Sequence, residues 1–126
     1  MILGLGTDIV RIDRIEKLQK RFGARFLKRC FTGAENAHAD NPRKLAKRFA
    51  AKEAAAKALG LGITSAIRWH HFEVVNDAHG APTLRLHKGA LERLQSLTPT
   101  GKAPSILISL SDEDNLALAV VVISAD

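Results

Sequence analysis

RFAAKEAAAKALG, residues 48 to 60, places a carboxylate where the helix that this segment predicts should bury apolar side chains. At about 100° per residue, Glu53 falls near the middle of the apolar face, and Lys57 lies beside it one turn further on. An ionised carboxylate on a packed face is costly unless it meets a cation, a metal ion or several hydrogen-bond donors. The apolar face consists of Leu45, Ala46, Phe49, Ala50, Ala56 and Gly60.

Spacing alone leaves two interpretations of Glu53 open. The first is a structural ion pair with Lys57 at i, i+4, which stabilises an exposed helix by about 0.2–0.5 kcal/mol. The second is a functional acid that meets a metal ion or another charged group from a different part of the chain. Lys47, Arg48 and Lys52 point to other sides of the helix and do not decide between the two.

The residues around this segment predict a long helix from about Pro42 to Leu59. Asn41 is a typical N-cap residue, and a proline suits the first helical turn. Gly60 and Gly62 follow the last apolar positions and indicate where the helix ends.

A second carboxylate in apolar surroundings lies near the N-terminus. Residues Ile2–Val10 predict a first strand that ends near Asp8, and the next helix begins near Arg11 and is interrupted at Gly23. Asp8 is explained either as a cap of that helix or, if the fold brings it to Glu53, as half of a magnesium site. Magnesium needs only one or two protein carboxylates, because water and substrate phosphate complete its coordination.

The second half of the chain contains mostly strands. Residues 72–75 and 83–86 predict a hairpin, 90–97 a short amphipathic helix, and 105–110 and 116–123 two final strands. Helices and strands are segregated rather than alternating, which favours an α+β fold with a mostly antiparallel sheet and a long central helix. We expect one domain, residues 1–126.

The charge of the chain points to an anionic partner or substrate. Nineteen Lys and Arg residues against 13 Asp and Glu residues give a net charge of +6. Five Phe, one Trp and no Tyr are few aromatic residues for a protein that stacks single-stranded bases. A non-enzymatic basic module that binds nucleic acid or an acidic protein remains an alternative. One helix face carries a basic stripe, Arg14, Lys17, Arg21 and Arg25, which is either solvated or a docking surface.

Other features argue against several protein classes. The single Cys30 suits a reducing compartment, and neither a signal peptide nor a membrane-spanning apolar segment is recognisable, so we expect a cytoplasmic protein with no membrane partner. The HExxH, GxxxxGK[ST] and GxSxG motifs are absent. The five histidines have no zinc-ligand spacing, and we expect each on the surface or in a loop.

Four motifs together resemble the holo-[acyl-carrier-protein] synthase family, the small 4'-phosphopantetheinyl transferases. Residues 4–10, GLGTDIV, are similar to the N-terminal GxDI motif of that family, and residues 48–60 are similar to its RFAAKEAxxKAxG helix. Gly80-Ala81-Pro82 resembles the G-x-P of its central hairpin, and residues 109–111 resemble its C-terminal SxS. The resemblance spans nearly the whole chain.

The resemblance implies roles for particular residues. Asp8 and Glu53 match the two magnesium ligands, and Lys57 matches the lysine at the pyrophosphate. Coenzyme A contacts are implied for Arg48, Lys57, Gly60 and Pro82. The implied reaction transfers 4'-phosphopantetheine from coenzyme A to a serine of apo acyl carrier protein, releases adenosine 3',5'-bisphosphate and serves fatty acid biosynthesis.

The resemblance also implies a homotrimer with active sites at the subunit interfaces and an acidic carrier protein as the partner, not nucleic acid. The basic stripe is then a docking surface for that carrier. One departure stands out: many family members continue SxS with histidine, whereas this chain has Asp112. An anion beside a bound phosphate is repulsive, so a nucleotide contact at this position is in doubt.

Overall fold

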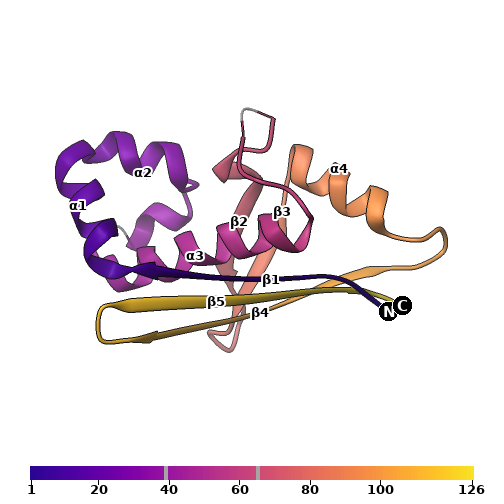
Figure 1. Cartoon of the computed structure of the whole chain (residues 1–126). Helices are drawn as coiled ribbons and strands as arrows, with labels where there is room; N and C mark the ends of the chain where they lie inside the picture. The colour runs from indigo at the N-terminus through magenta and orange to yellow at the C-terminus, as the bar shows by residue number, and fades with distance from the viewer. Residues whose placement is uncertain (39, 65) are drawn as a thin grey trace.

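The computed structural model describes residues 1–38, 40–64 and 66–126, which form an α+β fold (Figure 1). The helices are α1 (Ile12–Phe22), α2 (Ala24–Cys30), α3 (Pro42–Ala58) and α4 (Lys88–Leu97), with 3-10 turns η1 (Glu35–His38) and η2 (Trp69–His71). The strands are β1 (Ile2–Arg11), β2 (Phe72–Asn76), β3 (Pro82–Leu86), β4 (Pro104–Glu113) and β5 (Leu116–Ala125). The predicted order of elements is confirmed.

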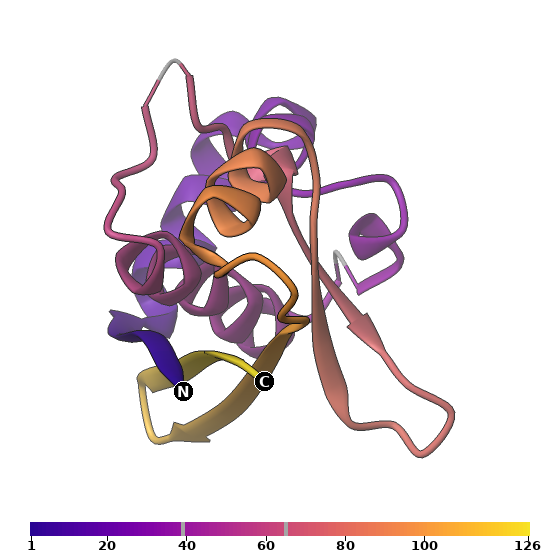
Figure 2. The same ribbon diagram turned by 90° about the vertical axis from the view of Figure 1, so that its right-hand side faces the viewer.

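All strand pairing is antiparallel within the described residues. A three-stranded sheet has the order β1-β5-β4, and β2 and β3 form a separate hairpin. The two chain termini lie side by side at one end of the large sheet (Figure 1), where the Met1 ammonium donates to the carbonyl of Ala125 at 2.9 Å. The α3 helix lies along one face of this sheet, and the hairpin extends beside it (Figure 2).

The α3 helix forms where the sequence predicts a long helix, and it supplies many of the buried residues. The Asn41 side chain caps it by accepting from the Lys44 amide at 3.2 Å, and the helix ends at Ala58, one residue before the predicted end. Most of its side chains are buried, including the alanines at 50, 51, 54, 55 and 58, and the helix packs on β5, where Ala117 and Ala119 are also buried. These small side chains let the helix approach the sheet closely.

Two local predictions near the N-terminus have different outcomes. Gly23, with φ +53°, separates α1 from α2, as its position in the helical pattern predicts. The predicted end of the first strand at Asp8 is wrong. The ladder with β5 continues through Asp8 opposite Ala119 to Arg11 opposite Leu116, because β5 offers a full-length partner.

The outer face of the large sheet is apolar and exposed. Leu5 pairs with Val122, which pairs with Leu107, so these side chains form a row across the three strands. Leu5 and Leu107 are each 66% exposed, and Ile9 beside them is 60% exposed. No helix in the part of the chain that the structure describes is long and apolar enough to span a membrane.

Candidate active site

Glycine brings the first strand onto the central helix. A Cβ at Gly4 would lie 1.9 Å from the Ala58 carbonyl oxygen, and one at Gly6 would lie 1.8 Å from that of Ala54. Both distances are far below contact, so only glycine allows β1 to lie this close to α3. Asp8, two residues beyond Gly6, consequently faces the last turns of α3.

The ion pair of Asp8 is with Lys57. The Lys57 ammonium donates to the Asp8 carboxylate at 3.1 Å and to the Thr7 carbonyl at 3.0 Å. The alternative role of Asp8 as a helix cap is wrong, because the N-cap residue of α1 is Arg11, and the Asp13 amide of the first turn donates to the Asn115 side chain at 2.9 Å. Lys57 therefore does not form the intrahelical ion pair with Glu53 that the spacing suggested. Its ion-pair partner is Asp8 on β1.

Glu53 lies close enough to Asp8 for their charges to repel. Partial burial raises the pKa of Glu53, the negative charge of Asp8 raises it further, and Lys57 and Arg14 act in the opposite direction. Two carboxylates held near each other at a surface can be relieved by one hard divalent cation. Among the described residues no group of three or more His, Cys, Asp or Glu side chains is placed to hold a metal ion.

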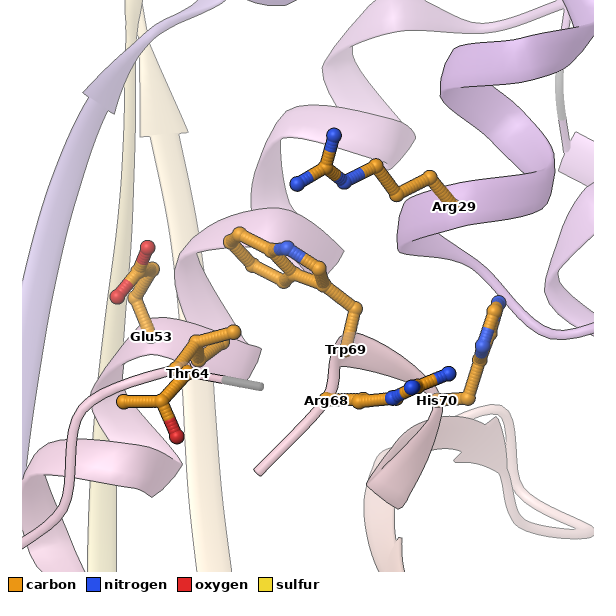
Figure 3. A pocket seen from close by; sticks show the side chains of 7 residues that line it. Arg29, Glu53, Thr64, Arg68, Trp69 and His70 are labelled. Carbon is orange, nitrogen blue, oxygen red and sulfur yellow. The ribbon is translucent and has the colours of Figure 1, made fainter. Parts of the chain in front are cut away.

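Glu53 lines a pocket of about 720 Å³ between α3, α2 and the segment that leads to β2 (Figure 3). Arg29 and Trp69 face the same space, with Arg68, His70, Thr64 and Ile63 completing its wall. The Trp69 ring stacks on Phe49 with centroids 4.5 Å apart. The sequence analysis did not propose Arg29 or Trp69 as site residues. The one feature that could have pointed to this pocket is that the only tryptophan of the chain follows Arg68 directly.

The predicted coenzyme A contacts divide between two sides of α3. Arg48 and Pro82 line a second pocket of about 190 Å³, together with Lys44, Lys47, Val74, Asn76, Gly80 and Leu110. Arg48 is only 7% exposed, and its Nε has no hydrogen-bond partner. Lys57 lies instead near the C-terminal end of α3, where it contacts Asp8, and Gly60, which has φ +72°, follows that end of the helix.

The basic stripe is exposed but not continuous. Arg14, Lys17 and Arg21 lie on α1, whereas Arg25 lies on α2 beyond the break at Gly23. Arg14 lies over the Phe49 ring at 5.7 Å and acts electrostatically on Glu53, which places this end of the stripe beside the candidate site.

Sequence reasoning missed the burial of three charged or polar groups, Lys52, its partner Glu35 and His71. Lys52 is fully buried, and its ammonium donates to the Glu35 carboxylate at 2.5 Å and to the Cys30 carbonyl at 2.7 Å. The surface or loop position expected for every histidine is wrong for His71, which is 7% exposed and accepts from the Arg68 amide through Nδ1.

Comparison with known families shows the class of the protein. The model of the 4'-phosphopantetheinyl transferase superfamily matches residues 4–121, and the chain belongs to this superfamily of enzymes. Within the superfamily it belongs with the holo-[acyl-carrier-protein] synthases. The enzyme of that name from Azorhizobium caulinodans is 50% identical over 130 residues, covering 100% of this chain and 96% of the relative.

Solved structures agree with this assignment. The holo-[acyl-carrier-protein] synthase of Neisseria meningitidis is 40% identical and superposes with a TM-score of 0.83, covering 98% of this chain and 99% of that one. The enzyme of Helicobacter pylori, crystallised with coenzyme A, is 35% identical with a TM-score of 0.82, covering 95% of this chain and 99% of that one.

Proposed function

We infer that this protein transfers the 4'-phosphopantetheine arm of coenzyme A to a serine of an apo acyl carrier protein. The observation that carries the inference is the convergence of Asp8, Glu53 and Lys57 where β1 crosses α3. In the reaction the serine oxygen bonds to the phosphorus of the arm, the bond from that phosphorus to the bridging oxygen breaks, and adenosine 3',5'-bisphosphate leaves. We assign this activity to fatty acid biosynthesis in the cytoplasm, where an unpaired, buried thiol such as Cys30 is usual.

We propose Asp8 and Glu53 as the residues that hold Mg²⁺. Their oxygens are hard ligands, and burial together with the repulsion from Asp8 raises the pKa of Glu53, so a divalent cation is favoured between them. When bound, the ion supplies positive charge that polarises a phosphoryl oxygen. Lys57, with its side chain half-exposed beside Asp8, is placed to stabilise negative charge on the departing phosphate.

The pocket of Arg48 and Pro82 suits the nucleotide end of coenzyme A. Lys44, Lys47 and Arg48 bring three positive charges to a small space, and the unpartnered Nε of Arg48 is a buried donor without an acceptor. A phosphate oxygen would satisfy such a donor, because buried donors strongly favour a partner. Gly60 would let the backbone approach the other end of the ligand, near Lys57.

We propose that each complete site is shared between two subunits of a homotrimer. Arg48 and Glu53 are five residues apart on α3, which turns them about 140° away from each other. One ligand that contacts both groups is then more simply held between Glu53 of one copy and Arg48 of the next. The exposed apolar face around Leu5, Ile9 and Leu107 supports self-association, because apolar patches of this kind mark interfaces.

We further propose the basic stripe as the docking surface for an acidic carrier protein. Arg14, at the end nearest Glu53, would guide the carrier serine to the site, and Lys17, Arg21 and Arg25 extend the positive surface along α1 and α2. Such exposed charges speed association and confer salt sensitivity more than they add affinity.

The activity is tested by incubating the protein with coenzyme A, Mg²⁺ and an apo acyl carrier protein and measuring the mass of the carrier. We expect the carrier to gain one phosphopantetheine, and the gain to disappear with EDTA or with Asp8→Asn. Glu92→Gln on α4 is the matched control and should keep full activity. No mass gain with the unaltered protein would contradict the inference.

Shared sites are tested by mixing two inactive variants. A homotrimer of Glu53→Gln lacks an intact metal pair, and one of Arg48→Ala lacks the nucleotide pocket. After subunit exchange, some interfaces combine the intact Glu53 of one copy with the intact Arg48 of the next, so activity should reappear. If the mixture stays inactive after verified exchange, each site lies within one chain.

A further inference from the structure

The N-terminal half of α3 is joined to the β4-β5 hairpin by one bridging carboxylate. Each carboxylate oxygen of Asp112 forms an ion pair at 2.9 Å, one with Arg43 and the other with Lys47. Arg43 also donates to the Asp114 carbonyl at 2.6 Å. Arg43 and Lys47 are four residues apart on α3, so a single carboxylate can bridge them.

One of these two cations belongs to the Arg48 pocket. Lys47 lines that pocket beside Lys44 and Arg48, while its ammonium is held by Asp112. Leu110, two residues before Asp112 on β4, lines the same pocket. Asp112 thus pairs with one of the three cations that line this pocket. Hydrogen bonds from Lys47 and Arg43 lower the pKa of Asp112, which keeps it ionised.

We propose that Asp112 competes with the ligand phosphate for Lys47. This competition lowers the affinity of the Arg48 pocket for phosphorylated nucleotides. The proposal rests on the proposed function, because it takes the nucleotide end of coenzyme A as the occupant of this pocket. Where Asp112 already neutralises Lys47, an incoming phosphate must either displace the carboxylate or bind with one cation fewer. Both the substrate and the adenosine 3',5'-bisphosphate product are then held less tightly, which favours release of the product.

A purely positioning role would have the opposite consequence. If Asp112 served to hold Lys47 in place for the phosphate, removing the carboxylate would let the lysine move away, and nucleotide binding would weaken. If the charge of Asp112 acted only through the general field of the protein, any nearby acid would have the same effect. The sign of the change, compared with a neighbouring acid, distinguishes these roles.

Asp112→Asn removes the charge and nearly keeps the shape, and Asp114→Asn is the matched control. Asp114 lies on the same hairpin but contacts Arg43 through its backbone carbonyl, so its substitution removes an equal charge without freeing Lys47. The dissociation constant for adenosine 3',5'-bisphosphate is measured by isothermal titration calorimetry at low and at high salt. Asp112→Ser replaces Asp112→Asn if the latter does not fold.

We expect Asp112→Asn to bind the bisphosphate about three- to tenfold more tightly at low salt, because the freed cations attract the phosphate. The gain should shrink at high salt, and Asp114→Asn should change binding less than about twofold. Unchanged or weaker binding by Asp112→Asn, equal tightening by Asp114→Asn, or undetectable binding by every form would each overturn the proposal.

Two further measurements show which phosphate occupies the pocket and whether a failed prediction concerns Asp112 or the proposed function. Adenosine 5'-monophosphate, which lacks the 3'-phosphate, is titrated in parallel: tightening limited to the bisphosphate assigns the 3'-phosphate to the pocket, and tightening of both nucleotides assigns the 5'-phosphate. The same preparations are assayed for transfer to the carrier protein. Transfer without the expected tightening overturns the role of Asp112 alone, whereas absence of transfer by the unaltered protein overturns the proposed function.

Discussion

Lys52 and Glu53 are neighbours on α3, yet their surroundings differ completely. Lys52 is fully buried, and its charge is matched by Glu35 and by the Cys30 carbonyl. Glu35 in turn accepts from the amides of Thr32 at 2.9 Å and Val74 at 3.1 Å, so the group ties α3 to η1 and β2. Glu53 is half-buried, and after burial the largest influence on its pKa is the negative charge of another acid, Asp8.

The difference teaches how to separate a structural charge from a functional one. A buried charge with all its partners in place stabilises one arrangement of the chain and offers nothing to a ligand. A half-buried acid whose neighbour has the same sign keeps a repulsion that a bound cation can relieve. Lys52 and Glu53 represent these two cases within one turn of helix.

The largest expected effect is that of Glu53→Gln on activity. We expect kcat/KM for transfer to fall by more than about a thousandfold, equivalent to about 4 kcal/mol in the transition state, because one of two metal-ligating carboxylates is lost. The melting temperature should stay the same or rise, since the substitution removes the repulsion with Asp8. Calorimetry and the carrier assay on the same preparation check both, and a marked loss of stability would place Glu53 with Lys52 as a structural residue.

Lys52→Met should have the opposite effects to Glu53→Gln: it should lower the stability of the fold and change the transfer rate little. Removing the ammonium leaves the Glu35 carboxylate buried without its cation, which costs about 3 kcal/mol or more in the free energy of unfolding. Urea denaturation measures the loss. Adding Glu35→Gln removes the uncompensated charge and should restore part of it, while the transfer rate of either variant, assayed well below its melting temperature, should change far less than that of Glu53→Gln.

The sequence predicts the elements of this fold better than the partners of its charges. The long helix, its Asn41 cap and the break at Gly23 are local features, and each was predicted correctly. The pairing of Lys52 with Glu35 depends on a turn 17 residues away, and an isolated lysine in a sequence is normally expected in solvent. Burial of both partners is therefore decided by packing that the local pattern does not contain.

The candidate site was predictable only in part, for the same reason. Helical spacing identified Glu53 and Lys57 as unusual neighbours, but the position of Asp8 depends on the close contact of Gly4 and Gly6 with α3. That contact joins residues about fifty positions apart, and glycines in a strand do not by themselves reveal what they approach. Spacing left open whether Asp8 meets Glu53, and only the resemblance to a known family predicted that the two acids form one site.

The exposed arginines and lysines of α1 are a third case beside Lys52 and Glu53, because they are neither buried nor half-buried. Arg21→Glu should raise the KM for the carrier protein about tenfold and leave the KM for coenzyme A nearly unchanged, because Arg21 is exposed and has no role at the nucleotide. Lys102→Glu makes the same change of charge in the loop before β4 and serves as the control. Equal effects of the two substitutions, or equal effects on both substrates, would contradict a docking role for the stripe.

The smallest expected effect, and the most direct probe of the contrast between Lys52 and Glu53, is the pH dependence of stability. Because burial and Asp8 raise the pKa of Glu53 in the folded state, the folded protein binds more protons than the unfolded chain between the two pKa values. Below the unfolded value, about 4.3, Glu53 is protonated in both states and costs nothing. As the pH rises through the folded value, the destabilisation appears in full, though solvent screening of a half-exposed group keeps it below about 1 kcal/mol.

Glu53→Gln should therefore gain stability relative to the unaltered protein between about pH 4 and pH 7, measured as the difference in melting temperature. Mg²⁺ added at pH 7 should remove that difference by raising the melting temperature of the unaltered protein but not of the variant, because the ion is expected to bind between Asp8 and Glu53. A difference that is independent of pH would mean that Glu53 is not strained by its surroundings. A pH-dependent difference that Mg²⁺ leaves unchanged would contradict binding of this ion between Asp8 and Glu53.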